Sequence, residues 1–241
     1  MSGFVDLHCH YLPGIDDGVR TAEEGIALLG GLAGLGFVKV VATPHIRTAM
    51  FENDRPGLEA AYAAFREGLE GVPGMPETGL GAEHYFDDVV WDLFARGGAL
   101  PYPGGKAALI EFPTRAIPVG VEHRLFELNV RGIRPVLAHP ERYDPLFKRT
   151  DALDPLLGIG VLPLLDIMSL TGKYGRAPRK AAERMVEEGV YYAACSDSHR
   201  PAHVEIVAKG IARLRKLVGD EEAEELLAEN PRRILEGTVE T

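Results

Sequence analysis

Short apolar runs alternate with helix-like segments along almost the whole chain, and this alternation constrains the fold more than any other sequence feature. Seven runs have the near-continuous apolar character of strands that are covered on both faces. They are Phe4–Leu7, Val38–Ala42, Thr78–Ala82, Ala107–Ile110, Pro135–Ala138, Val161–Leu165 and Tyr191–Ala194. Strands that alternate with helices form parallel βαβ units. About seven such units favour a closed α/β barrel over an open doubly wound sheet.

Helical patterns fill the intervals between these runs. The first predicted helix begins at Thr21, where Thr-Ala-Glu-Glu places Glu24 in the position of a capping box, and it runs to about Gly34. The other predicted helices cover residues 56–70, 87–96, 118–131, 144–157, 177–188 and 203–218. Residues 220–236 are expected to form a further helical pair that is broken by Pro231.

The length and composition of the chain suit one sizeable core. The chain has 241 residues, of which 46% are hydrophobic, and α/β barrels of this length often form one domain. It has no low-complexity tract and no block of like charge. We therefore expect a single domain over residues 1–241.

The termini, cysteines and charge indicate a cytoplasmic protein. The N-terminal sequence lacks a basic stretch followed by an apolar run, so we expect no signal peptide. The apolar runs of the chain are too short to span a bilayer, so we expect no membrane insertion. Two cysteines, Cys9 and Cys195, are too few for a disulfide scaffold. A net charge of −10 argues against a nucleic-acid partner, which requires a basic face.

Residues that can bind metal ions stand at the ends of six of the seven predicted strands. The carboxyl ends of barrel strands meet at one rim, so these side chains are expected to lie together. They are His8, His10, His45, Glu83, Glu111, His139, Asp197 and His199. His8 and His10 are two residues apart on an extended chain and share a face, and Asp197 and His199 repeat that spacing.

The donor types suggest more than one ion. Imidazole mixed with carboxylate suits Zn²⁺, Mn²⁺ or Fe better than Ca²⁺ or Mg²⁺ alone. Eight donors exceed the needs of one tetrahedral ion, so two or three ions that share a carboxylate are expected. Such a cluster can activate a water and bind both oxygens of an in-line displacement. A structural zinc site at Cys9 is disfavoured, because Cys9 has the opposite parity to its neighbours and no CxxC pair exists.

Arginines follow several of these residues. Arg142 comes after His139 in His-Pro-Glu-Arg, and Arg200 follows His199. Guanidinium groups match phosphate oxygens and stabilise the charge that develops on them. The glycine-rich stretch 98–106 lacks P-loop spacing, and no Gly-x-Ser-x-Gly elbow is present. Phosphate chemistry at a metal cluster is therefore the favoured interpretation.

An ordered set of motifs resembles the polymerase and histidinol phosphatase (PHP) superfamily, and most of all the bacterial manganese-dependent protein-tyrosine phosphatases of capsule and exopolysaccharide gene clusters. The motifs span nearly the whole chain. They are Asp-Leu-His-Cys-His near the start, Ile-Asp-Asp-Gly at 15–18, Ala-Thr-Pro-His at 42–45, Gly-Ala-Glu at 81–83, Leu-Ile-Glu-Phe at 109–112, Ala-His-Pro-Glu-Arg-Tyr at 138–143, Ser-Leu-Thr-Gly at 169–172, Ser-Asp-Ser-His at 196–199 and Glu-Asn-Pro-x-x-Ile-Leu at 229–235.

This resemblance implies a distorted seven-stranded, TIM-like (β/α) barrel with a trinuclear site built from the same eight residues. It implies that Glu111 bridges ions and that a metal-bound hydroxide attacks the phosphorus of phosphotyrosine. Arg142 matches the family's phosphate-binding arginine. The family's second arginine has no match position for position after His199, so Arg200 is the candidate substitute. The residues expected to act in catalysis are thus Arg142, Arg200 and Asp197.

The substrate and the metal stay open at this level. The resemblance favours a phosphotyrosine protein, such as a bacterial tyrosine kinase of polysaccharide biosynthesis, and manganese as the ion, with zinc or iron as alternatives. Histidinol phosphate, another small phosphomonoester or a phosphodiester would use the same site. An amidohydrolase is disfavoured because Glu111 stands where that family commonly has a modified lysine. A non-catalytic scaffold remains the alternative outside enzymes, and a homo-oligomer is compatible with the sequence.

Overall fold

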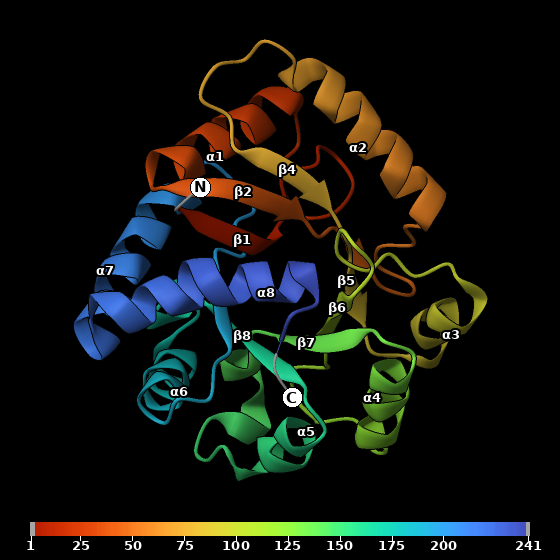
Figure 1. Ribbon diagram of the computed structural model, residues 1–241, viewed down its shortest axis with the longest axis vertical. Coiled ribbons are helices and arrows are strands. Elements are labelled where there is room, and N and C mark those ends of the chain that lie inside the picture. Colours follow the sequence, from red (N-terminus) through yellow and green to blue (C-terminus); the bar gives the residue numbers. More distant parts are fainter. Residues whose placement is uncertain (1–2, 240–241) are drawn as a thin grey trace.

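A computed structural model describes residues 3–239 and consists of parallel strands surrounded by helices (Figure 1). The strands are assigned to two parallel sheets. The first has the order β1-β2-β4, with β1 Phe4–Cys9, β2 Phe37–Ala42 and β4 Glu77–Leu80. The second has the order β3-β5-β6-β7-β8-β9, with β3 His45–Ile46, β5 Glu83–Tyr85, β6 Ala107–Glu111, β7 Arg134–Ala138, β8 Leu162–Asp166 and β9 Ala193–Cys195.

Hydrogen bonds continue across the gap between the two sheets. Strand β2 leads into β3 through Thr43 and Pro44, and β4 leads into β5 through two residues. The Gly81 N–H donates to the Ala42 carbonyl over 2.8 Å, and the Glu83 N–H donates to the Pro44 carbonyl over 3.1 Å. Because Pro44 has no N–H, the regular ladder is interrupted there although the strands stay side by side. Strands β2 and β3 therefore form one bent strand of the ring, and β4 and β5 form another.

The other ends of the two sheets also meet. The Asp197 N–H donates to the His8 carbonyl, and the His10 N–H donates to the Ser198 carbonyl, both over 2.9 Å. These bonds join β1 to the segment that follows β9 in a parallel bridge between Cys9 and Ser198. The strands thus follow one another around a ring of seven positions, so the predicted α/β barrel is confirmed.

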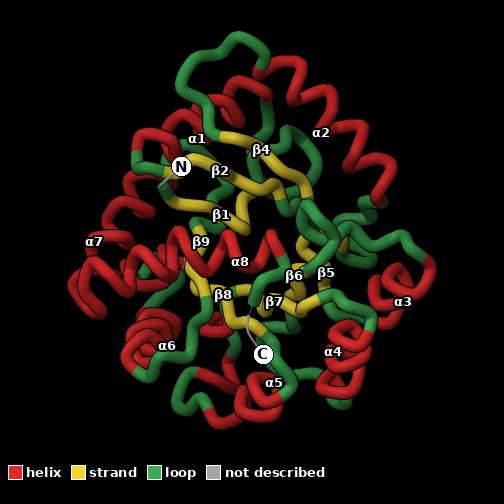
Figure 2. Tube along the Cα trace, viewed as in Figure 1, coloured by secondary structure: helices red, strands yellow, loops and turns green. Residues whose placement is uncertain are grey.

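The inside of the ring is apolar below the rim. A cluster that includes Val5, Leu7, Leu109, Val136 and Leu164 fills it. Helix α8, Asn230–Glu236, lies across the ring in the view of Figure 2 and adds Ile234 to this cluster. The opposite rim, at the carboxyl ends of the strands, is where polar side chains gather.

Six of the predicted helices are present with ends close to those expected. They are α1 Ala22–Gly34, α2 Arg55–Leu69, α3 Asp88–Arg96, α4 Val121–Val130, α6 Arg176–Glu187 and α7 His203–Glu224. The Thr21 hydroxyl accepts the Glu24 N–H, as a capping box requires, whereas Glu24 returns a bond to the N–H of Arg20. None of the helices in residues 3–239 combines the length and apolar character needed to cross a membrane.

The prediction of a helix over residues 144–157 was wrong. The segment contains the 3₁₀ turns Asp144–Leu146 and Asp151–Leu153 and a short helix, α5 Asp154–Gly158. Pro145 and Pro155 explain the difference, because proline removes a backbone donor and its ring clashes with the preceding turn of a continuous helix.

The C-terminal helical pair also breaks at a different residue. Gly219, with φ 87° and ψ 174°, interrupts α7, whereas Pro231 lies in the first turn of α8. A π-helical turn over Glu225–Glu229 joins the two helices. Proline is tolerated in a first helical turn, where its missing N–H would have no partner within the helix, so it does not break the chain here.

Candidate metal centre

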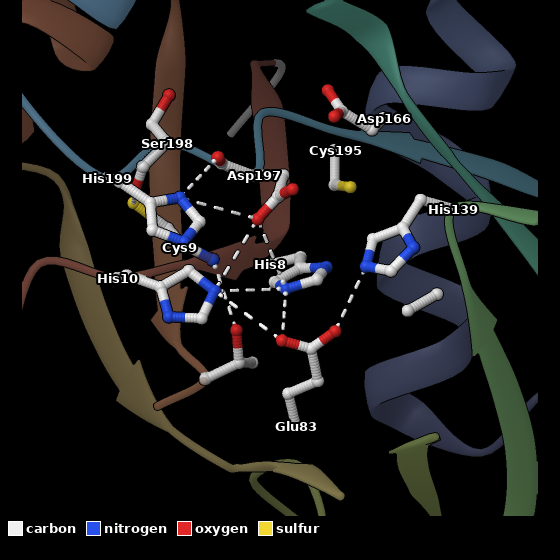
Figure 3. Close-up of polar contacts among 12 residues, drawn as sticks. His8, Cys9, His10, Glu83, His139, Asp166, Cys195, Asp197, Ser198 and His199 are labelled. Atoms are coloured by element: carbon white, nitrogen blue, oxygen red, sulfur yellow. Dashed lines mark hydrogen bonds and ion pairs between the residues drawn. The ribbon is translucent and has the colours of Figure 1, made fainter. Parts of the chain in front are cut away.

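The eight predicted metal-binding residues lie together at the carboxyl rim of the barrel. Figure 3 shows six of them converging from β1, β5, β7 and the segment after β9. Together with Asp17, which was not among the predicted residues, they form four overlapping groups in which the donor atoms of a group lie within 4.8 Å of one another. The groups are His8, Glu83 and His139; His8, His10 and Asp197; His45, Glu83 and Glu111; and His10, Asp17, His45 and His199. Convergence from different strands is what the barrel geometry predicts.

Glu83 lies at the middle of the site. Its Oε2 lies 3.1 Å from His8 Nε2 and 2.9 Å from His45 Nδ1, and its Oε1 lies 3.0 Å from His139 Nε2. It occurs in two of the four groups, whereas Glu111 occurs in one. Glu83 is therefore placed to be shared between ions, and Glu111 adds a second carboxylate beside it.

Asp197 faces the imidazoles of β1. Its Oδ1 lies 3.4 Å from His8 Nε2 and 3.5 Å from His10 Nε2. The backbone of Asp197 has φ 44° and that of His139 has φ 34°, both in the left-handed region that non-glycine residues seldom adopt. Such strain persists where the surrounding structure enforces it and is common at functional sites.

A fourth group reaches the surface. Asp17 Oδ1 lies 3.4 Å from His45 Nε2 and 3.4 Å from His199 Nε2. The side chain of Asp17 is 59% exposed, compared with 12% for His45 and 17% for His199. This group therefore opens to solvent, while the groups around Glu83 and Asp197 are buried.

Asp16 orients two of the histidines from behind. Its Oδ2 lies 2.7 Å from His10 Nδ1 and accepts the His45 N–H over 3.1 Å, and its Oδ1 accepts the Gly18 N–H over 2.9 Å. A proton on His10 Nδ1 leaves the lone pair of Nε2 directed into the cluster, which is the arrangement typical of metal-bound imidazoles. Asp6 does not orient the His8 ring in this way: its Oδ1 accepts the backbone N–H groups of His8 and Ser196, and within residues 3–239 the imidazole Nδ1 of His8 has no partner.

The charges at this site suit a cation. Burial alone would raise the pKa of Glu83, but the charges of His8 and His45 keep it well below its ordinary value. Burial and then the charge of Arg142 lower the pKa of His139 to about 4, which keeps that imidazole neutral. Burial and then the charge of Glu83 raise the pKa of Glu111 to about 7.

Within the described residues 3–239, the buried Oε2 of Glu111 has no hydrogen-bond partner. In addition, the Nε2 atoms of His8 and His10 lie 3.1 Å apart, beside two carboxylates. Lone pairs that converge in this way fit divalent metal ions, which bind deprotonated imidazole and carboxylate.

The two predicted catalytic arginines lie in different surroundings. Arg142 Nη1 donates to Asp197 Oδ2 over 2.6 Å and lies 3.7 Å from Asp166 Oδ2. Its guanidinium carbon lies 4.5 Å from the centre of the Tyr174 ring. Arg200 instead lines a surface cavity with Arg20, Glu24 and residues 16–18. The structure thus brings Arg142 into the cluster and places Arg200 beside its exposed group.

Sequence reasoning missed some residues of the rim. Asp166 ends β8, so the one predicted strand that lacked a metal-binding residue, 161–165, also delivers a carboxylate; that predicted strand ended one residue earlier. Asp17 lies in the Ile-Asp-Asp-Gly motif, which was noticed but given no role. His84, in contrast, points away from the site, because its ring bonds the carbonyl of Leu109 and the N–H of Leu100.

Known proteins share this fold and sequence pattern. A family model described as "Capsular polysaccharide synthesis, CpsB/CapC" matches residues 4–236. Tyrosine-protein phosphatase YwqE of Bacillus subtilis strain 168 is 29% identical over 197 residues, or 81% of this chain and 77% of YwqE. Tyrosine-protein phosphatase CpsB of Streptococcus pneumoniae is 27% identical over 240 residues, or 96% of this chain and 98% of CpsB.

Solved structures are similar to this chain as well. A chain from the crystal structures of YwqE and CpsB, described as "unique metal-dependent tyrosine phosphatases", has a TM-score of 0.88 and 26% identity, covering 96% of this chain and 94% of that chain. A phosphotriesterase homology protein from Escherichia coli has a TM-score of 0.57 and 14% identity over 97% of this chain and 99% of that chain. The second likeness concerns the fold alone.

Proposed function

The chain belongs to the CpsB/CapC family of capsular polysaccharide synthesis, and on that basis we propose that it is a metal-dependent protein-tyrosine phosphatase. The observation that carries the proposal is the convergence of eight imidazole and carboxylate side chains at one rim. It occurs in a fold that matches the tyrosine phosphatases YwqE and CpsB over nearly the whole chain. We propose that residues 1–241 form one such domain.

The site would take two or three divalent ions. The buried groups around Glu83 and Asp197 would hold two of them, and the exposed group around His45, His199 and Asp17 would hold a third. Manganese is the proposed ion, and zinc or iron fits the same donors. When bound, such ions supply an activated water and positive charge for the phosphoryl oxygens.

Arg142 would bind the phosphate. Its guanidinium is fixed by Asp197 and by the ring of Tyr174, so little side-chain freedom is lost when a substrate arrives. Further N–H groups of the fork are available for phosphoryl oxygens, and charge-assisted bonds of this kind are among the strongest in proteins. Burial lowers the pKa of Arg142, but the charges of Asp197 and Asp166 raise it more, so the group stays charged.

The exposure of the outer group supports a protein as the substrate. Asp17, His45 and His199 reach the surface, so a tyrosine side chain on another protein could approach them. The proposed substrate is a phosphotyrosine protein, in particular a bacterial tyrosine kinase of polysaccharide biosynthesis in the cytoplasm. Both cysteines are free and buried, which is compatible with a reducing compartment.

A parallel assay tests the proposal. Metal-stripped protein is refilled with Mn²⁺, Zn²⁺ or Fe²⁺, and phosphate release is measured from a phosphotyrosine peptide and from histidinol phosphate. We expect faster release from the peptide. Faster release from histidinol phosphate would move the enzyme to small phosphomonoesters and contradict the tyrosine assignment. Unchanged activity in Glu111→Ala would contradict the assigned site itself.

A further inference from the structure

A lysine beside the metal centre has no acidic partner. Lys173 lies in the loop between the 3₁₀ segment Ile167–Thr171 and α6. Its contacts are Met168 Sδ at 3.5 Å, the imidazole nitrogens of His203 at 2.8 and 3.1 Å, and the ring of Tyr174 with a centroid at 5.3 Å. Within residues 3–239, no carboxylate forms an ion pair with it.

Several other cations of the described residues do have an acidic partner. Lys39 is paired with Glu77, Lys209 with Glu205, and the guanidinium of Arg142 with Asp197. Lys173 is half-buried, and an ammonium that leaves water without a counter-charge is unfavourable. Burial accordingly lowers the pKa of Lys173, against the opposing charges of Asp166 and Asp197. A half-buried cation in this position suggests that an anion arrives from outside.

His203 cannot replace that anion. Its Nδ1 lies 3.1 Å from Lys173 Nζ and already accepts the backbone N–H of His199 over 3.1 Å, so this lone pair is shared between two donors. The closer nitrogen, Nε2 at 2.8 Å, carries the proton of the neutral ring in that tautomer and offers no lone pair. Burial and then the charge of Lys173 lower the pKa of His203 to about 4, so this ring is neutral. His203 therefore positions the ammonium without neutralising it.

The position of Lys173 places it beside Arg142. The ring of Tyr174 has the guanidinium carbon of Arg142 at 4.5 Å and the Lys173 Nζ at 5.3 Å from its centre. Both cations therefore lie against the same aromatic ring. Arg142 is also paired with Asp197 and Asp166 of the rim. The cavity lined by Arg200 includes neither of them.

We propose that Lys173 is the second cationic group that binds the substrate's phosphoryl oxygens, opposite or beside Arg142. The proposal rests on the proposed phosphatase function and assigns to Lys173 the role that sequence analysis gave to Arg200. The ammonium keeps its proton and donates N–H bonds to the phosphate, so no proton is transferred in this step. Two cations that are fixed before the reaction stabilise the charge that builds on the phosphoryl group.

Binding of inorganic phosphate to the metal-loaded enzyme tests this inference, because it does not depend on the identity of the leaving group. Calorimetry and competitive inhibition are measured for the wild type, Lys173→Met, Lys173→Arg and the control Lys180→Met, which alters an exposed lysine of α6. Loss of one charged hydrogen bond should weaken phosphate binding about 10- to 100-fold in Lys173→Met. Lys173→Arg should recover most of that loss, and Lys180→Met should match the wild type.

The number of bound metal ions distinguishes a loss of phosphate binding from a loss of the folded site. We expect Lys173→Met to retain the wild-type number of ions and its melting temperature. Phosphate affinity within about twofold of the wild type would overturn the inference, and so would weaker binding accompanied by loss of metal. If the wild type releases no phosphate from phosphotyrosine but binds inorganic phosphate through Lys173, the proposed function fails while Lys173 remains a phosphate-binding residue.

Discussion

The buried and exposed parts of the candidate metal centre differ in how strictly the fold fixes them. In the inner part, none of the side chains of His8, Glu83, His139 and Asp197 is more than 2% exposed. In the outer part, Asp17 is 59% exposed, and it lies on a loop rather than on a strand. Water and exchanging ions can thus reach the outer part directly, while the inner part is shaped by the barrel.

The charged side chains of the inner part also contact one another more than those of the outer part do. Glu83 lies beside four imidazoles, and Asp197 lies beside three imidazoles and Arg142. Buried carboxylates of this kind are costly without cations around them, so the inner part depends on its full set of partners. The outer part can lose one donor to water at a smaller cost. This difference leads to a graded series of expected effects.

The largest effect is expected from Glu83→Gln, which keeps the shape of the side chain and removes its charge. Loss of an indirect partner of a metal ligand already costs about 10- to 100-fold in activity. Glu83 lies in two of the four donor groups and would hold ions directly, so its loss should cost more than about 1,000-fold and should lower the number of bound ions. Elemental analysis and phosphate release from a phosphotyrosine peptide measure both.

Glu77→Gln is the matched control, because Glu77 is exposed on β4 and pairs with Lys39 on the surface. Exposed ion pairs contribute about 0–1 kcal/mol to stability, so this variant should keep its ions and its activity. Full metal content and activity in Glu83→Gln would show that the inner part does not depend on its shared carboxylate.

A smaller effect is expected from Asp17→Asn in the outer part. The amide oxygen can still coordinate weakly, and the site is open, so activity should fall about 10-fold at limiting metal. Added Mn²⁺ should restore most of it, whereas it should not restore Glu83→Gln. Activity measured against the concentration of added Mn²⁺ compares the two variants. If both respond alike to the ion, the distinction between the inner and outer parts is wrong.

The sequence predicted the inner part better than the outer part, and the reason is physical. His8, Glu83 and His139 stand at strand ends, where the barrel alone determines that they converge. Asp17 and Lys173 lie in loops, and their positions depend on contacts with distant residues that no local pattern encodes.

The local effects of proline and glycine also explain the errors in the predicted helices. The helical pattern of residues 144–157 predicted one helix, but Pro145 and Pro155 impose separate turns. Pro231 was expected to break a helix that Gly219 breaks instead, because the effect of proline depends on its position in the helical turn. Strand positions were more secure, since buried parallel strands need continuous apolar runs.

The smallest effect concerns a residue behind the inner part. Glu141 is buried and accepts hydrogen bonds from the Asp166 N–H, the Ser169 hydroxyl and the Tyr191 hydroxyl, at 3.1, 2.9 and 3.0 Å. Burial raises its pKa from 4.5 to about 7. The folded protein therefore binds this proton more tightly than the unfolded chain does. The resulting stabilisation is complete below pH 4.5 and is lost as the pH rises through about 7.

Glu141→Gln removes this titration while it keeps an acceptor for the same donors. The free energy of unfolding of the wild type, minus that of the variant, should thus fall between pH 5 and pH 8, by no more than about 3 kcal/mol. Urea unfolding at several pH values measures this difference, and titrations of the metal-binding residues cancel because both proteins share them. Glu141 touches the rim through Asp166 and the loop at Ser169, and it precedes Arg142 in the same turn. Because Gln keeps an acceptor for these contacts, activity should change less than in Asp17→Asn. A pH-independent difference would mean that Glu141 is ionised throughout, and the inner part would then contain one more buried charge than its cations balance.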